Sequence, residues 1–488
     1  MSISASSDDD RGQWGSKLGF IMAAAGSAVG LGNIWRFPYV TGENGGAAFV
    51  VVYLACVLFI GLPLMWCELA LGRASGRNPV GAFRETGGGL PFLFTGVLCL
   101  AACFFVLTYY GVIAGWTISY AISQISQTQL IFKEYVADPV YVLPVFALFI
   151  VLTVVIVRAG VEKGIEKWSK ILMPILFALM LVVIVRGVTL DGAGAGLNYY
   201  LKPDFGKIDG IVVLKALGQA FFSLSVGWGL MITYGSYMSK KEDIISNGFW
   251  VGLADTSVAL LAGLMIFPAV FAMGHTPDSG TGLAFTTLPA VFESMPGGWL
   301  VGAVFFLLLS VAAVTSSISM LEVPVSYFVD EKNSRRTTCA VIVGLLAFVV
   351  GIPSALSSGG NEWLSNITLF GQKGFFSILD QVFGTLALIV ISLMLSIYVG
   401  WVWKPKNAIA EIEQGCDWFT KPLFGAIAPA SVWTFFVKFI CPIVISLVLL
   451  NTLGLFDKED SEPAPQPKTE PAVPTQTSPE DNASSPSQ

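Results

Sequence analysis

The sequence predicts an all-α membrane protein. Apolar residues make up 54% of the 488 residues and charged residues only 12%, whereas a soluble protein carries roughly a quarter charged residues. The mean hydropathy is +0.72. Apolar runs of about 20 residues, the length that crosses a bilayer as a helix, recur along the whole chain. These three observations exclude a soluble globular class and predict a polytopic helical bundle.

About eleven candidate spans follow one another along the chain. They cover roughly 14–40, 45–72, 91–124, 140–158, 165–187, 211–239, 247–273, 299–328, 338–356, 376–403 and 433–455. We divide the chain into an N-terminal tail (1–13), a first five-helix repeat (14–187), a second five-helix repeat (188–403), a cytoplasmic loop with the eleventh helix (404–455) and a C-terminal tail (456–488). The last segment is rich in Pro, Ser, Glu and Thr, so we expect it to be disordered.

Lysine and arginine indicate the orientation of the chain in the membrane. They concentrate at 73–84, 158–170, 240–241, 332–336 and 404–421, which all lie on one side when the spans alternate. We therefore expect the N-terminus in the cytoplasm, the C-terminus outside, and the protein in the cell inner (plasma) membrane. The semi-apolar segment 281–296 is either a short helix over an outer entrance or a plain surface loop. We expect the seven cysteines to be buried as small hydrophobes and the lone His275 to be solvated.

The stretch GSAVGLGNIWRFP, residues 26–38, interrupts the first span with glycines and places Asn33 and Arg36 beyond them. Glycine weakens a helix, and an unwound turn in a bilayer is tolerated only where it lines a cavity or is buried in protein. The spacing Gly26-x-x-x-Gly30 has a second interpretation, a face for helix packing. From this segment alone both interpretations remain open.

The sixth span carries a similar interruption, GQAFFSLSVGWG at residues 218–229. Spans one and six hold equivalent places if the chain is two five-span repeats, and paired interruptions of this kind point to a transporter's binding site. An unwound turn exposes carbonyl oxygens that coordinate a cation. It also exposes amides at the start of the next half-helix, which favour a carboxylate. The two breaks therefore suit sodium and a zwitterionic amino acid.

Four stretches carry a family resemblance: WGSKLGFIMAAAGSAVGLGNIWRFPYVTGENGGAAF from residue 14, GQAFFSLSVGWG from 218, ITYGSY from 232 and SVAAVTSSIS from 310. Together they resemble spans one, six and eight of the neurotransmitter:sodium symporters, and the resemblance extends to about residue 455. It implies two inverted five-helix repeats with broken helices 1 and 6 and an eleventh helix. It also implies sodium-coupled import of a neutral amino acid by alternating access. The expected partners are that amino acid, Na⁺ and the lipid bilayer, without nucleic acid.

The resemblance implies two sodium sites. The outer site would use the Ala28 carbonyl, Asn33, Ser223 and Asp255 together with the substrate carboxylate. The second site would use the carbonyls of Gly26, Val29 and Ala312 and the hydroxyls of Thr315 and Ser316. Residues 312, 315 and 316 share one helix face, and hard oxygen ligands suit a hard ion. The alternative is that Thr315 and Ser316 only bond back to their own helix.

The resemblance also implies a substrate site between the breaks. The residues expected to bind substrate are Ser27, Ala28, Gly32, Tyr110, Phe222, Ser223, Ser225, Trp228, Ser316 and Met320. Phe222 and Tyr110 would form a lid, whereas Tyr109 is expected only to pack. Because Trp228 and Met320 are bulky, we expect a small substrate such as alanine or glycine. The alternative is that Trp228 swings aside and stacks on a larger apolar or aromatic amino acid.

Charged residues inside a membrane are costly and mark function. By resemblance, Arg36 would pair with Asp380 as an outer gate, near Gln219. Arg11 would pair with Asp330 as an inner gate, supported by Trp14, Ser236 and Tyr237. Each pair would close only when the opposite side opens. Glu68 lies too deep to reach the membrane surface, so we expect it to bind the free backbone of span six.

Asp255 is expected to balance the charge of the sodium ion. Bacterial relatives carry a fixed carboxylate in place of the chloride that animal relatives need, and their usual glutamate position is Ala259 here. Asp255 lies one turn earlier, at the sodium-ligand position, so we expect transport without chloride. A structural hydrogen bond is the alternative role. The competing functions are a non-transporting receptor or channel, and a membrane enzyme, for which the sequence shows no nucleophile–base pair or metal cluster.

Overall fold

The structure, a computed structural model, describes residues 12–274, 282–422 and 427–455. Nine helical stretches in these ranges are long and apolar enough to cross a membrane. They are Ala47–Ser75, Leu90–Ser126, Pro139–Val157, Val161–Val188, Ile244–Ala272, Gly298–Lys332, Arg336–Leu356, Phe375–Val402 and Pro429–Thr452. Spans one and six are missing from this set because both are broken. The predicted all-helical bundle is confirmed.

The first half of the chain forms helices joined by short loops. Its elements are α1 (Lys17–Ala28), η1 (Gly32–Arg36), α2 (Phe37–Glu43), α3 (Ala47–Cys56), η2 (Val57–Gly61), α4 (Leu62–Ser75), α5 (Pro79–Glu85), α6 (Leu90–Ser126), α7 (Phe132–Ala137), α8 (Pro139–Val157), η3 (Val161–Glu166) and α9 (Lys167–Val188). The η elements of this half are π-helical turns within or beside the longer spans.

The second half adds shorter helices and one small hairpin. Its elements are α10 (Ala193–Leu201), η4 (Phe205–Lys207), α11 (Gly210–Ser223), α12 (Leu230–Gly235), α13 (Ile244–Ala272), η5 (Leu283–Thr287), α14 (Leu288–Glu293), α15 (Gly298–Lys332), α16 (Arg336–Leu356), α17 (Glu362–Asn366), β1 (Thr368–Leu369), β2 (Gln372–Lys373), α18 (Phe375–Leu379), η6 (Asp380–Leu386), α19 (Ala387–Ile397), η7 (Tyr398–Val402), α20 (Pro405–Glu413), η8 (Asp417–Thr420), α21 (Pro429–Phe435), η9 (Phe436–Ile440) and α22 (Cys441–Thr452). Strands β1 and β2 pair antiparallel, with Thr368 opposite Lys373 and Leu369 opposite Gln372.

Span one breaks where its glycines predict. Helix α1 ends at Ala28, Val29 is extended, and the chain continues through η1 and α2 at an angle of 56° to α1. The packing interpretation also holds, because a Cβ on Gly26 would lie 3.2 Å from Cβ of Thr315 on α15. The break and the close helix packing therefore occur at the same place.

Span six divides into α11 and α12, separated by residues 224–229. Gly227 and Gly229 have φ values of +93° and +71°, and Ser225 has +53°. These left-handed conformations cost least at glycine, so the sequence permits the turn that ends one half-helix and starts the next. Ser225 is the non-glycine exception, and it lines the pocket described below.

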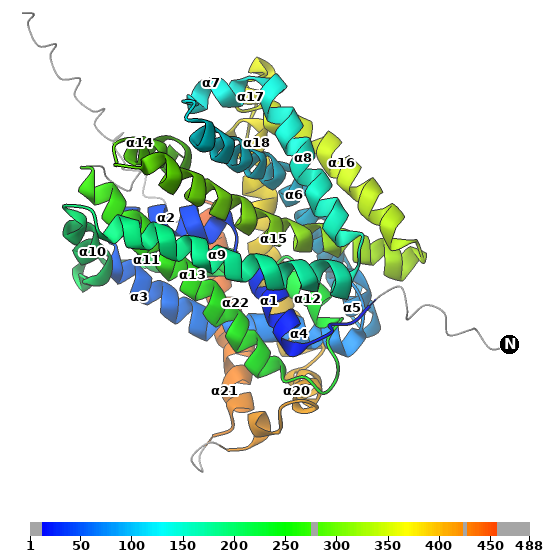
Figure 1. Cartoon of the computed structure of the whole chain (residues 1–488). Coiled ribbons are helices and arrows are strands. Elements are labelled where there is room, and N and C mark those ends of the chain that lie inside the picture. The colour runs from blue at the N-terminus through cyan, green and yellow to red at the C-terminus, as the bar shows by residue number, and fades with distance from the viewer. Residues whose placement is uncertain (1–11, 275–281, 423–426, 456–488) are drawn as a thin grey trace, which may run out of the picture.

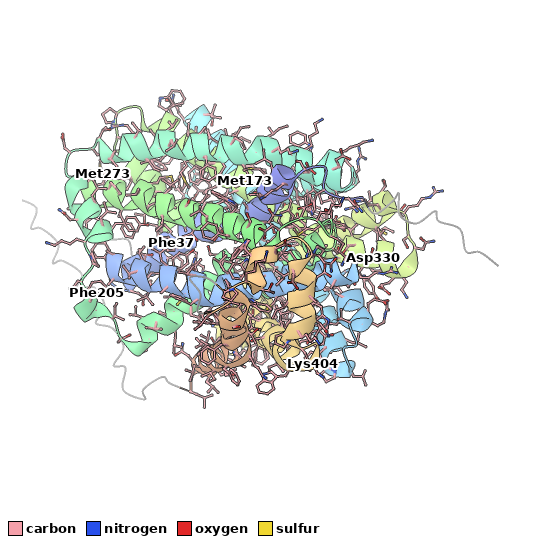
Figure 2. All side chains as sticks on the ribbon, turned by 90° about the horizontal axis from the view of Figure 1, so that it is seen from below. Phe37, Met173, Phe205, Met273, Asp330 and Lys404 are labelled. Carbon is pink, nitrogen blue, oxygen red and sulfur yellow. The ribbon has the colours of Figure 1, made fainter. Side chains whose placement is uncertain are left out.

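Several of the long helices pack against one another in the centre of the molecule. Figure 1 shows α9, α13 and α15 side by side, and both α13 and α15 contact α9. Helix α6 packs along α15, where the Thr117 and Ser310 hydroxyls lie 2.8 Å apart. Figure 2 places Phe205 and Met273 at one end of the molecule and Asp330 and Lys404 toward the other. These are the groups that the alternation of spans assigns to opposite sides.

Two smaller expectations are also settled in the described ranges. Residues 283–293 form η5 and α14, so the described part of this segment is helical and not a plain surface loop; its place over an outer entrance stays a prediction. The seven cysteines carry free thiols, and all except the half-buried Cys56 are buried, as expected. His275 lies outside the described residues.

Candidate functional site

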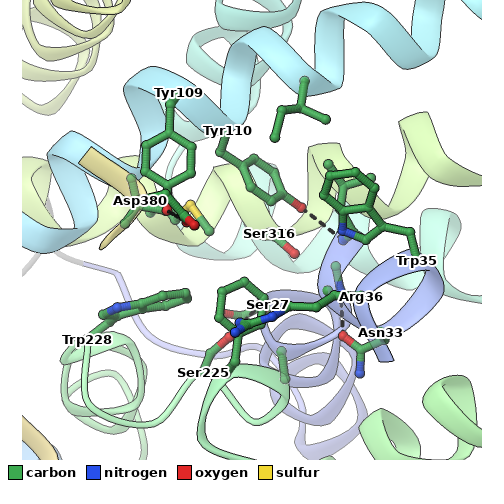
Figure 3. Close-up of a pocket in the computed structure, with 18 of the residues that line it drawn as sticks. Ser27, Asn33, Trp35, Arg36, Tyr109, Tyr110, Ser225, Trp228, Ser316 and Asp380 are labelled. Carbon is green, nitrogen blue, oxygen red and sulfur yellow. Dashed lines mark hydrogen bonds between the residues drawn. The ribbon is translucent and has the colours of Figure 1, made fainter. Parts of the chain in front are cut away.

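The two helix breaks open onto one pocket. It is a cleft that opens to solvent and is lined by both apolar and polar side chains, as small-molecule sites are. Figure 3 shows Tyr109, Tyr110 and Asp380 on one side and Ser225, Trp228 and Arg36 on the other. The lining residues are Ser27, Ala28, Gly30, Leu31, Gly32, Asn33, Trp35, Arg36, Tyr39, Val106, Tyr109, Tyr110, Ile113, Phe222, Ser225, Trp228, Ser316, Met320, Phe376 and Asp380.

The structure brings together the residues expected to bind substrate. Nine of them line this pocket: Ser27, Ala28, Gly32, Tyr110, Phe222, Ser225, Trp228, Ser316 and Met320. Ser223 instead belongs to a buried polar cluster beside the pocket. The hydroxyl of Ser27 is buried without a hydrogen-bond partner in the described part of the chain. A buried hydroxyl without a partner is costly, so this one favours the binding of a polar ligand group that would form a hydrogen bond with it.

The backbone of span one is exposed to the pocket because Gly30 and Gly32 have no side chains to cover it. The amide of Leu31 donates to the Tyr110 hydroxyl over 3.3 Å. A Cβ on Gly30 would lie 2.7 Å from Oγ of Ser316, and one on Gly32 would collide with the ring of Phe222. Only glycine lets these groups approach the backbone so closely. The arrangement offers amide donors and a phenol hydroxyl at one end of the pocket.

The five residues expected at the second sodium site also meet. Ser316 on α15 donates to the Val29 carbonyl over 2.9 Å and approaches the Gly26 carbonyl at 3.4 Å. Thr315 donates to the Ala312 carbonyl of its own helix over 2.9 Å. The own-helix alternative therefore describes Thr315 in this structure but not Ser316. Three carbonyls and two hydroxyls converge here, which is a donor set of hard oxygens.

Three of the four residues expected at the outer sodium site, Asn33, Ser223 and Asp255, form a buried cluster, and Ala28 lines the adjoining pocket. The Asn33 amide donates to Oγ of Ser223 over 2.8 Å and to Oδ1 of Asp255 over 2.7 Å. Ser223 donates to Oδ2 of Asp255 over 2.6 Å, and the Tyr53 hydroxyl reaches Ser223 over 3.0 Å. Oδ1 of Asn33 accepts from the Gly30 amide over 3.1 Å. Asp255 is fully buried, so its carboxylate is held entirely by these polar neighbours.

Glu68 on α4 satisfies the break in span six. Its Oε1 accepts from the Gly227 amide over 2.8 Å and its Oε2 from the Met231 amide over 3.1 Å. The prediction that Glu68 binds the free backbone of span six is confirmed. The carboxylate accepts hydrogen bonds from backbone amides that the unwound turn leaves without helical partners. Each such amide, left unpaired in a bilayer, would cost roughly several kcal/mol.

The predicted outer gate pair is not formed between Arg36 and Asp380 in this structure. The guanidinium carbon of Arg36 lies 4.2 Å from the centroid of the Phe222 ring. Asp380 instead accepts a hydrogen bond of 2.8 Å from the Tyr109 hydroxyl. The expectation that Tyr109 only packs was wrong, although its ring does contact Phe376 edge-on. Both gate residues line the pocket, and each has a different partner.

The predicted inner gate is only partly described. Arg11 lies outside the described residues, and Asp330 accepts from the amide and side chain of Asn78 over 2.8 and 3.1 Å. Trp14 donates to the Tyr234 carbonyl over 2.9 Å, and Ser236 donates to the Thr233 carbonyl over 2.6 Å.

Tyr237 donates to Glu322 over 2.6 Å. Glu322 also forms a buried ion pair with Arg336, which the sequence analysis missed. The signal was available, because Glu322 is an acidic residue inside an apolar span and Arg336 is a basic residue at the start of the next one.

A second missed residue is Glu166, which holds the start of span one. Its carboxylate accepts from the Gly15 amide over 2.7 Å and from the Ser16 hydroxyl over 2.9 Å. Lys170 forms an ion pair with it at 2.6 Å. Ser16 in turn caps α1 by accepting from the Gly19 amide. No sequence pattern indicated this contact, because the partners are separated by about 150 positions in the chain.

Comparisons with known proteins agree with this geometry. The model of the sodium:neurotransmitter symporter family matches residues 11–141 and 139–463. The sodium-dependent transporter YhdH of Bacillus subtilis is 39% identical over 452 residues, with 91% of this chain and 98% of the relative covered. A sodium-dependent transporter of Methanocaldococcus jannaschii is 32% identical, with 86% and 88% covered.

The solved structure of MhsT in complex with L-phenylalanine superposes on this fold with a TM-score of 0.81. It is 41% identical, and the match covers 91% of this chain and all of that one. The matched segments contain both helix breaks and the oxygen clusters around them. The chain therefore belongs to the sodium:neurotransmitter symporter family and is a sodium-dependent transporter, not an enzyme.

Proposed function

We propose that this transporter imports a neutral amino acid together with sodium by alternating access. The observation that carries the proposal is the meeting of the two helix breaks. They place amide donors, a phenol hydroxyl and two clusters of hard oxygens around one pocket. A carboxylate suits the donors at the start of a half-helix, and carbonyl and hydroxyl oxygens suit a substrate ammonium and sodium.

Two sodium ions accompany the substrate in this proposal. One lies among Gly26, Val29, Ala312, Thr315 and Ser316. The other lies among Ala28, Asn33, Ser223 and Asp255, where the carboxylate of Asp255 supplies the negative charge. Transport is therefore independent of chloride. The lysine and arginine bias supports a cytoplasmic N-terminus and an outside C-terminus in the plasma membrane.

The size of the substrate depends on one wall of the pocket. Trp228 and Met320 both line it, and Trp228 packs edge-on against Phe222 with ring centroids 5.6 Å apart. Their bulk is the basis for the prediction of a small substrate. The phenylalanine bound by MhsT, which is 41% identical, favours the larger apolar alternative, so we propose an apolar or aromatic amino acid as the preferred substrate.

A competition panel tests this proposal. Purified protein in proteoliposomes takes up one radiolabelled amino acid while unlabelled alanine, glycine, leucine, phenylalanine or tryptophan competes. Burial of a Leu or Phe side chain is worth about 1.5–3 kcal/mol, so phenylalanine should outcompete alanine by about tenfold or more. Preference for alanine or glycine would restore the small-pocket prediction. Sodium-dependent binding without any uptake would instead indicate a receptor.

A further inference from the structure

Tyr109 on α6 contacts Asp380, one of the two residues of the predicted outer gate. Its side chain is buried, and its hydroxyl donates to Oδ1 of Asp380 over 2.8 Å. The ring lies edge-on to Phe376, with centroids 5.2 Å apart and planes at 74°. Asp380 is the first residue of the π-helical turn η6. The hydroxyl therefore has one defined acceptor, and the ring is held in place on a second element.

The absence of a side chain at Gly384 allows the Tyr109 hydroxyl to approach the Asp380 carboxylate. A Cβ at Gly384 would collide with both the Tyr109 hydroxyl and Oδ1 of Asp380. Gly384 is buried and lies one turn after Asp380 within η6. A residue with any side chain would push the two oxygens apart, so the close approach of Tyr109 to Asp380 depends on this glycine.

Arg36 has a partner of its own while Asp380 is held by Tyr109. Its guanidinium carbon lies 4.2 Å from the centroid of the Phe222 ring, which is the distance of a cation–π contact. The two opposite charges thus line one pocket and yet remain apart. Attraction between them is opposed by a hydrogen bond on one side and a cation–π contact on the other.

We propose that Tyr109 is a positioning residue that keeps the outer gate open by holding Asp380 away from Arg36. This inference rests on the proposed function, because it assumes that closure joins Arg36 to Asp380. The next residue, Tyr110, accepts from the Leu31 amide at the substrate end of the pocket. Two consecutive tyrosines on one helix therefore contact the gate and the break in span one. A substrate that moves Tyr110 would also disturb the hold on Asp380.

A labelling experiment measures how accessible the pocket is from outside, without any substrate. Val106 lines the same pocket one helical turn from Tyr110, and Val106→Cys places a small reporter there. Intact cells are treated with a membrane-impermeant charged methanethiosulfonate in sodium buffer, with the native chain as the blank for its own cysteines. Tyr109→Phe removes only the hydroxyl, and we expect it to slow labelling of the reporter several-fold. Gly384→Ala, which separates the same pair from the other side, should slow labelling in the same way.

The matched control is Tyr120→Phe on the same helix. Its hydroxyl is buried, and the described residues provide no hydrogen-bond partner for it, so labelling should keep its native rate. The decisive background is Arg36→Ala. Without the arginine, Asp380 has no cation to move toward, so Tyr109→Phe should no longer slow labelling. An equal slowing in the presence and absence of Arg36, or unchanged labelling in Tyr109→Phe, would overturn the proposal, as would a reporter that is never labelled.

Substrate binding supplies the second measurement. When only a fraction of the protein is open, the apparent dissociation constant rises by the inverse of that fraction. Tyr109→Phe should therefore raise KM several-fold and leave the maximal rate near the native value. A merely structural role would lower the maximal rate and the melting temperature without raising KM. If uptake of every amino acid fails but the labelling pattern holds, the error lies in the proposed function and not in the role of Tyr109.

Discussion

Thr315 and Ser316 show how two hydroxyls on one helix face serve different neighbours. Ser316 reaches across to the carbonyl of Val29, while Thr315 turns back to Ala312. A sodium ion between them would replace these hydrogen bonds by ion–oxygen contacts without moving either helix far. Ser316 therefore already joins span one to α15, and under the proposed function a sodium ion would strengthen this link.

The double substitution Thr315→Val with Ser316→Ala removes both hydroxyls and keeps the packing volume. Loss of two polar contacts at roughly 1.5–3 kcal/mol each should lower the apparent sodium affinity about 100-fold or more. Uptake should fall to background even at high sodium. Ser319→Ala on the same helix is the control, because its hydroxyl donates to the Ser316 carbonyl and it is not one of the expected sodium ligands. Unchanged sodium activation in the double variant would remove these residues from the ion site.

Asp255→Asn tests the fixed negative charge. Asparagine keeps one oxygen for the ion and loses the charge that balances it, and an unbalanced buried charge is costly. The initial rate should fall roughly tenfold or more and recover in part with chloride. The measurement is the initial uptake rate in chloride and in gluconate, for the native chain and for the variant. A native rate that collapses in gluconate would contradict the role of Asp255.

At the scale of elements, each break in a spanning helix needs a partner for its free backbone. Glu68 provides one for span six, through the amides of Gly227 and Met231. In Glu68→Gln the side-chain amide offers one oxygen instead of two and adds a donor that faces other donors. Hydrogen exchange at residues 227–231 should accelerate, and transport should be lost. Retained protection in this segment would mean that other groups hold the break.

Glu166 holds the start of span one through hydrogen bonds to residues 15 and 16. Glu166→Ala frees the Gly15 amide and the Ser16 hydroxyl, so exchange at residues 15–19 should rise and the inner end of α1 should loosen. Glu162→Ala is the matched control, since Glu162 is exposed one turn earlier in η3. Equal exchange in both variants would show that Glu166 does not restrain the helix.

The sequence was most informative where a residue type permits only a few conformations. The glycine-rich stretches at 26–32 and 218–229 located both breaks, because glycine weakens a helix, and Gly227 and Gly229 adopt left-handed backbone there. Glu68 was assigned correctly because a short acidic side chain deep in a membrane must find donors. Tyr109 was misread, since a tyrosine in an apolar helix gives no sign of whether its hydroxyl has a partner. Glu166 and Gly384 could not be found, because their roles arise from contacts between distant segments.

For the whole molecule, the two oxygen clusters flank one unwound turn of span one. One cluster joins the turn to α15 through Ser316, and the other joins it to α11 and α13 through Asn33, Ser223 and Asp255. Ions bound on both sides would fix the turn that also lines the substrate pocket. Sodium and substrate would therefore stabilise the same local structure, and each would raise the affinity for the other by the same factor.

Uptake driven by an imposed sodium gradient tests this coupling most directly. Proteoliposomes loaded with potassium buffer are diluted into sodium or potassium buffer containing radiolabelled phenylalanine at equal osmolarity. We predict accumulation above the external concentration only with sodium outside, and its loss when an ionophore dissipates the gradient or when Thr315→Val and Ser316→Ala are combined. Equal accumulation in potassium, or uptake that stops at the external concentration despite an intact sodium gradient, would contradict sodium-coupled transport through this site.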